Sequence, residues 1–151
     1  MYDIILSFVT AFISAYIAIP SVISIARKKN LVDEPNERRS HEVSTPSLGG
    51  IGLFAGIFFT IILWTPFEVF GDLQYILCSM LILYLIGSRD DIIPMDPKKK
   101  LLGQVIAAFI LVVIANVQIT SFYGVFGIDS IPDYLGIPFS IFVVLTIVNA
   151  F

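Results

Sequence analysis

Five long apolar runs, separated by short polar segments, dominate the pattern of this chain. Each run contains few or no charges and approaches the length of about 20 apolar residues that a helix needs to span a bilayer core of about 30 Å. Backbone groups in lipid must be satisfied within the segment, which favours helices over any open structure. The predicted helices lie near residues 2–26, 49–65, 71–89, 101–117 and 135–151. The pattern predicts an all-α fold class, a polytopic transmembrane helix bundle that occupies residues 1–151.

The composition supports this class. Hydrophobic residues form 57% of the chain and charged residues only 14%, whereas soluble domains carry nearer a quarter charged residues. The first apolar run has no basic residue before it, and the basic cluster Arg27, Lys28 and Lys29 follows it. A secretory signal has the opposite order and a shorter apolar core. We therefore interpret the first run as a transmembrane helix whose N-terminus lies outside.

The distribution of charge predicts the orientation of the bundle. All nine basic residues fall in two of the polar segments: Arg27, Lys28, Lys29, Arg38 and Arg39 in the first, and Arg89, Lys98, Lys99 and Lys100 in the second. In the segments 65–72 and 118–134 every charged residue is acidic. With five helices the two basic segments lie on one side, which the positive-inside rule assigns to the cytoplasm.

The two basic segments also hold the candidate chemistry. Seven of the twelve acids lie in them: Asp33, Glu34, Glu37, Glu42, Asp90, Asp91 and Asp96. Carboxylates beside cations indicate a divalent metal with a phosphorylated ligand, because Mg²⁺ prefers carboxylate and phosphate oxygens and Lys or Arg neutralises the remaining phosphate charge. Asp90 and Asp91 are adjacent at the end of a predicted helix, where a cation would relieve their repulsion. The alternative is an ordinary solvated acidic turn.

Three other features have simpler interpretations beside a functional one. Gly49 and Gly50 open the second helix, which allows either close helix packing or backbone contact with a ligand. Packing is the preferred interpretation. His41 is the single histidine, and a solvated loop position explains it. Cys78 lies within an apolar run and behaves there as a small hydrophobe.

Three segments, in order, resemble the signatures of the polyprenyl-phosphate N-acetylhexosamine-1-phosphate transferases. The first is Asp33-x-Pro35-Asn36-x-Arg38-Arg39-x-His41 with Pro46-x-x-Gly49-Gly50. The second is Gly87-x-x-Asp90-Asp91 with Lys100-Leu101-Leu102-x-Gln104. The third begins with Asn149-Ala150-Phe151. The resemblance spans essentially the whole chain and covers the N-terminal half of a family member.

The resemblance implies transfer of a sugar 1-phosphate from a UDP-sugar to undecaprenyl phosphate, with release of UMP, as the first step of cell-envelope polysaccharide synthesis. It implies Mg²⁺ as cofactor, with Mn²⁺ as the alternative ion, held by Asp90 and Asp91. By the same resemblance the catalytic residues are Asp33, Asp90 and Asp91. The implied substrate-binding residues are Lys100, Arg38, Arg39, His41 and Asn149.

The stretch from Leu31 to Asn36 resembles the simple N-acetylhexosamine branch of the family, which favours UDP-N-acetylglucosamine as donor. The implied location is the bacterial inner membrane, with the active face cytoplasmic, a homodimer as the assembly and no nucleic-acid partner. Family members are about twice as long, and this chain stops at Phe151, before the aspartates of the third signature. The alternative hypothesis is therefore a truncated, inactive membrane fragment or a subunit of a split enzyme.

Overall fold

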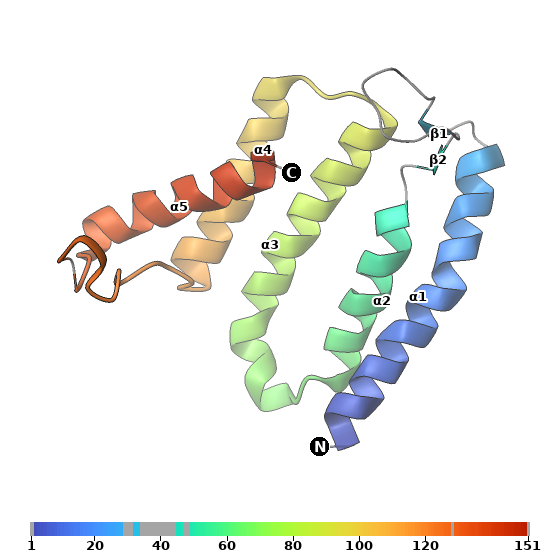
Figure 1. The fold of residues 1–151 in the computed structure, drawn as a ribbon, viewed down its shortest axis with the longest axis horizontal. Coiled ribbons are helices and arrows are strands. Elements are labelled where there is room, and N and C mark those ends of the chain that lie inside the picture. The colour runs from blue at the N-terminus through green and yellow to red at the C-terminus, as the bar shows by residue number, and fades with distance from the viewer. Residues whose placement is uncertain (1, 29–31, 34–44, 47–48, 128, 151) are drawn as a thin grey trace. The chain divides into compact units, whose positions relative to one another are not determined.

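The computed structural model describes residues 2–28, 32–33, 45–46, 49–127 and 129–150, with only the backbone described at the two strands, Asp72 and Phe126 (Figure 1). The main helices are α1 (Tyr2–Lys28), α2 (Gly49–Trp64), α3 (Phe67–Ile92), α4 (Pro97–Phe109) and α5 (Asp133–Ala150). A π-helical turn, η1 (Ile110–Ile114), continues α4, and a short 3-10 turn, η2 (Val125–Gly127), precedes α5. The predicted all-α class with five main helices is confirmed.

Two helices, Tyr2–Lys28 and Asp133–Ala150, are long and apolar enough to cross a membrane, and Gly49–Trp64 is a shorter apolar helix. The structure differs from the sequence-based expectation in the first polar segment. There β1 (Val32–Asp33) and β2 (Thr45–Pro46) form an antiparallel pair in which Asp33 lies opposite Thr45. Such short strands leave no alternating apolar pattern, so periodicity does not predict them.

The chain divides into two compact units, of which the first comprises Met1–Pro66 and Ser88–Pro94. Its core is the contact between α1 and α2, which lie side by side (Figure 1). Gly52, Gly56 and Thr60 are buried at successive four-residue intervals along α2. This spacing places them on one helix face, and their small size allows the two backbones to approach closely.

A side chain at either glycine would meet α1. A Cβ added to Gly56 would lie 2.9 Å from the backbone nitrogen of Ala15, and one added to Gly52 would lie 2.9 Å from Cγ1 of Ile19. The glycines expected to pack closely were Gly49 and Gly50, and this expectation is wrong. Within the described part of the chain, nothing lies within 4 Å of a Cβ at either position. The close approach begins one turn farther along α2.

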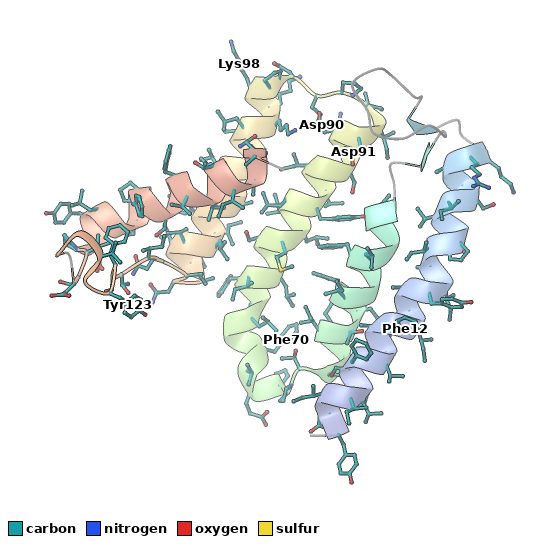
Figure 2. The ribbon with its side chains drawn as sticks, in the orientation of Figure 1. Phe12, Phe70, Asp90, Asp91, Lys98 and Tyr123 are labelled. Atoms are coloured by element: carbon teal, nitrogen blue, oxygen red, sulfur yellow. The ribbon has the colours of Figure 1, made fainter. Side chains whose placement is uncertain are left out.

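The outer side of α1 is apolar and exposed. Phe8, Phe12 and Tyr16 form a stacked row along this helix, with neighbouring ring centroids 6.5 and 6.2 Å apart. Figure 2 shows Phe12 on α1. An apolar surface of this kind suits contact with lipid rather than with water.

The second unit comprises Phe67–Gly87 and Met95–Phe151. In it the hydroxyl of Ser79, on α3, donates a hydrogen bond of 2.9 Å to the backbone carbonyl of Ala107 on α4. Another hydroxyl connects α5 to the segment after η1. Ser140 accepts the backbone N–H of Ile119 at 2.8 Å and donates to the carbonyl of Gly136 at 2.7 Å. Polar contacts therefore join the helices of this unit.

Candidate functional site

The last turn of α3 carries the acid pair. Pro94 restricts Ile93 to extended backbone, and Ile93 has φ −137° and ψ 109° while its N–H donates to the carbonyl of Arg89 at 2.8 Å. The helix therefore ends at Ile92, directly after the acids. Asp90 is half-buried and Asp91 is exposed, and Figure 2 shows both on this turn.

Four residues separate the end of α3 from helix α4, which begins at Pro97. Asp96 is its N-cap and accepts the backbone N–H of Lys98 at 3.4 Å, while Pro97 takes the first helical position. Pro suits that position because its missing N–H would have no partner there. The three lysines of the second basic segment consequently lie in the first turn of α4, where Figure 2 shows Lys98.

Five of the charged side chains at these helix ends oppose the helix dipoles, although Arg89 in the last turn of α3 and the N-cap Asp96 of α4 agree with them. Acids are unfavourable at the C-terminus of a helix and bases at its N-terminus, yet Asp90 and Asp91 end α3 and Lys98, Lys99 and Lys100 begin α4. At each end the dipole and these side chains therefore have the same sign. The end of α3 favours a cation, and the start of α4 favours an anion such as phosphate.

Helix stability does not explain these charges, because exchanging the two sets between the helix ends would stabilise both helices. A cation would compensate the aspartates that end α3, and a phosphate group would compensate the lysines that begin α4. The two sets belong to different units. Of the other predicted residues, Asp33 lies in β1, while Arg38, Arg39 and His41 lie outside the described residues.

The second and third signatures meet in one part-buried contact. Asn149, at the end of α5, donates a hydrogen bond of 3.0 Å from Nδ2 to Oε1 of Gln104 on α4. The same Nδ2 donates to the carbonyl of Leu145 at 2.8 Å. Gln104 is 2% exposed, and Lys100 lies one turn before it on the same face of α4. The sequence identified both partners, but not their contact across 45 positions.

The donor set at the end of α3 fits magnesium. Mg²⁺ is usually held by one or two carboxylates together with substrate phosphates and water, and the two adjacent aspartates provide such carboxylates. No cluster of three or more His, Cys, Asp or Glu side chains occurs among the described residues.

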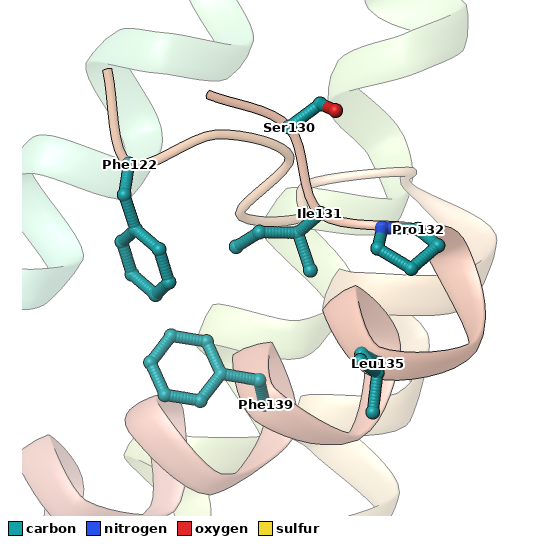
Figure 3. A pocket seen from close by; sticks show the side chains of 6 residues that line it. All are labelled: Phe122, Ser130, Ile131, Pro132, Leu135 and Phe139. Atoms are coloured by element: carbon teal, nitrogen blue, oxygen red, sulfur yellow. The ribbon is translucent and has the colours of Figure 1, made fainter. Parts of the chain in front are cut away.

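The segment before α5 contains an apolar cavity of about 320 Å³, lined by Phe122, Ser130, Ile131, Pro132, Leu135 and Phe139 (Figure 3). The rings of Phe122 and Phe139 meet edge to face, with centroids 5.5 Å apart. The lining has no titratable side chain, which provides no group for acid–base chemistry. The sequence likewise indicated no chemistry in this segment.

Comparison with known proteins identifies relatives of the chain. Residues 73–151 match the profile of glycosyl transferase family 4. The chain is 30% identical over 128 residues to the undecaprenyl-phosphate alpha-N-acetylglucosaminyl 1-phosphate transferase of Escherichia coli O157:H7, which covers 84% of this chain and 34% of the relative. The protein of the same name from Pasteurella multocida is 29% identical over 123 residues, 81% of this chain and 34% of the relative. That from Yersinia pestis is 28% identical over 128 residues, with coverage of 84% and 34%.

The chain thus spans about a third of the length of the curated relatives that it matches. No solved structure matches it significantly.

Proposed function

This chain belongs to glycosyl transferase family 4, and we propose that it contributes catalytic residues to an enzyme that transfers N-acetylglucosamine 1-phosphate from a UDP-sugar to undecaprenyl phosphate. The relatives' names specify this lipid and this sugar phosphate for those proteins. The activity is proposed for the whole protein to which the chain supplies Asp33, Asp90, Asp91, Lys100 and Asn149.

The placement of charge at the two helix ends carries the proposal. Two aspartates end α3 and three lysines begin α4, each set against its own helix dipole. Phosphoryl transfer requires mainly positioning and compensation of charge, and these helix ends supply groups of both signs. The residues of the three signatures support the same chemistry.

In the proposed reaction, a phosphate oxygen of the lipid attacks the sugar-bearing phosphorus of the UDP-sugar. A new oxygen–phosphorus bond forms between lipid phosphate and sugar phosphate, the bond from that phosphorus to the bridging oxygen breaks, and UMP leaves. One aspartate of the pair accepts the proton of the lipid phosphate if that phosphate is protonated. Lys100 neutralises phosphate charge, and Arg38, Arg39 and His41 line the entrance for the nucleotide sugar. We assign Asp33 a further catalytic role.

Asp90 and Asp91 would hold Mg²⁺, with Mn²⁺ as an alternative because it also accepts carboxylate oxygens. Such an ion, when bound, neutralises charge on the transferring phosphoryl group. The two aspartates are adjacent in the sequence, so we assign the metal and proton roles to the pair.

The decisive experiment measures incorporation of radiolabelled UMP into UDP-N-acetylglucosamine by membranes containing the full gene product. Incorporation is expected only with both Mg²⁺ and polyprenyl phosphate. Asp90→Asn and Asp91→Asn should each lower the rate about a hundredfold or more, since a metal site supplies several kcal/mol of transition-state stabilisation. Wild-type rates in both variants would remove the acid pair from the mechanism.

Asp96→Asn is the matched control for these variants. It removes one carboxylate from the same polar segment, and Asn is as good an N-cap as Asp. The start of α4 should therefore persist, and the exchange rate should stay within about twofold of the wild type. An equal loss in all three variants would indicate a general dependence on charge rather than a site.

The proposed location is the bacterial inner membrane with the basic segments in the cytoplasm and the N-terminus outside. Cysteines placed at Ser44 and Ser130 in a Cys78→Ser background test the orientation. Residue 130 should react with a membrane-impermeant thiol reagent applied to intact spheroplasts, and residue 44 should react only after permeabilisation. The reverse pattern would overturn the topology. A homodimer stays a prediction.

A further inference from the structure

The contact between Gln104 and Asn149 fixes which atoms of the Asn149 amide remain available. Leu145 offers a backbone carbonyl, which can only accept a hydrogen bond. The Asn149 atom 2.8 Å from it must therefore be the nitrogen Nδ2. The Gln104 atom 3.0 Å from that nitrogen must in turn be an acceptor, which is Oε1. The backbone thus determines the orientation of both amides.

These two bonds leave a single atom for a ligand. A side-chain amide has two N–H donors and one carbonyl acceptor, and Nδ2 directs its donors to Gln104 and Leu145. The carbonyl Oδ1 has no hydrogen-bond partner among the described residues. Asn149 itself is exposed whereas Gln104 is buried, so its free acceptor is accessible while its donor group is engaged.

We propose that Gln104 is a positioning residue that makes Asn149 an acceptor for the nucleotide sugar. The ligand group is a hydrogen-bond donor, a hydroxyl or N–H of the UDP-sugar, and not a phosphate oxygen, which would need the engaged N–H groups. This inference rests on the proposed function and adds to it the polarity of one substrate contact and the residue that determines it.

Two substitutions of similar length test the positioning role in the full gene product. Gln104→Met removes the acceptor, frees one N–H of Asn149 and should raise KM for UDP-N-acetylglucosamine about fivefold to tenfold, the typical value of one neutral hydrogen bond, with kcat little changed. Gln104→Glu keeps a carbonyl oxygen in either protonation state. Its KM should stay within about twofold of the wild type.

A double substitution separates positioning from a direct role. Asn149→Ala should raise KM at least as much as Gln104→Met, and Gln104→Met should add nothing in the Asn149→Ala background. Independent, multiplying effects would show that Gln104 acts without Asn149 and would overturn the proposal. An unchanged KM in Gln104→Met would also overturn it. Inhibition by UMP shows which part of the substrate donates the hydrogen bond to Asn149. If Gln104→Met weakens inhibition by UMP as much as it raises KM, the donor group lies on the nucleotide. If inhibition is unchanged, the donor group lies on the sugar.

A measurement on the chain itself does not depend on activity. In ¹⁵N-labelled protein in lipid nanodiscs, Gln104→Met should shift one of the two side-chain N–H signals of Asn149, whereas Gln104→Glu should retain the hydrogen-bonded position. Ser79→Ala is the matched control, because it removes another buried hydrogen bond of α4 without touching Asn149. Unchanged Asn149 signals in Gln104→Met would overturn the pairing, whereas absence of UMP exchange in wild-type membranes would overturn the proposed function alone.

Discussion

The pair α1–α2 and the pair α4–α5 hold together in different ways. Between α1 and α2 the contact depends on the absence of side chains at Gly52 and Gly56, which brings α2 against the backbone of α1. Between α4 and α5 it depends on a polar bond, from Asn149 to Gln104. The first pair gains van der Waals contact, and the second gains a directional hydrogen bond.

The difference separates packing from chemistry in an apolar chain. Lipid removes most of the hydrophobic driving force between helices, so small residues and hydrogen bonds provide their association. Glycine packing requires only shape and leaves no polar group for a ligand. A polar contact requires matched donors and acceptors, and it leaves the unmatched atom, here Oδ1 of Asn149, for binding. The proposed substrate contact accordingly lies in the pair α4–α5.

The largest expected effect comes from filling the glycine contact. Gly56→Leu places a side chain where even a Cβ would lie 2.9 Å from the backbone nitrogen of Ala15. Because backbone cannot give way as a side chain can, the substitution should lower the free energy of unfolding by more than about 3 kcal/mol. Unfolding in detergent can be followed by the fluorescence of Trp64, the single tryptophan.

Gly50→Leu is the matched control for this prediction, since it makes the same change on the same helix. Nothing within the described residues lies within 4 Å of a Cβ at Gly50, and its effect should stay within about 0.5 kcal/mol, as for other surface substitutions. Equal losses in both variants would mean that leucine perturbs α2 itself, and the packing explanation would then fail.

A smaller effect is expected from removing the hydroxyl of Ser140 in the second unit. Ser140 is 3% exposed and accepts the N–H of Ile119, so Ser140→Ala leaves that backbone donor without its partner. The cost should be about 1–3 kcal/mol, measured by thermal unfolding followed by circular dichroism. Thr146→Ala removes an exposed hydroxyl bonded only within α5 and should cost less than about 0.5 kcal/mol. A neutral Ser140→Ala would show that polar contacts contribute little here.

The helices could be predicted because apolar runs of this length leave few alternatives. The exact positions where the helices begin and end at charged residues were harder to predict. Segment 65–72 looked like a loop because it carries Glu68 and Asp72, yet α3 already begins at Phe67. Acidic residues are favourable in the first turn of a helix, where Glu68 lies, so Glu68 marks the start of α3 and not a gap. The lysines 98–100 likewise lie within α4.

Pairings between helices could not be predicted for a different reason. Seven of the ten glycines lie in the predicted second to fourth helices, and nothing in the sequence distinguishes Gly56 from Gly50. The distinction depends on which face of α2 meets α1. Gln104 and Asn149 both lie in segments that resemble the family signatures. A rotation of either helix about its own axis would nevertheless separate their side chains. The sequence therefore identified the residues, whereas their contact could be found only from the structure.

The smallest predicted effect concerns a polar bond between α1 and α2. The indole Nε1 of Trp64 donates to Oγ1 of Thr10 at 3.1 Å, at the end of α2 away from Gly52. If packing dominates this pair, Thr10→Val should cost only about 0.5–1 kcal/mol, because the partly buried indole N–H loses its acceptor but no shape changes. Trp64 fluorescence and thermal unfolding in detergent measure both consequences, and Ser7→Ala, which removes a hydroxyl bonded only within α1, provides the baseline. A loss as large as that of Gly56→Leu would show that a hydrogen bond dominates both pairs, and the contrast between them would disappear.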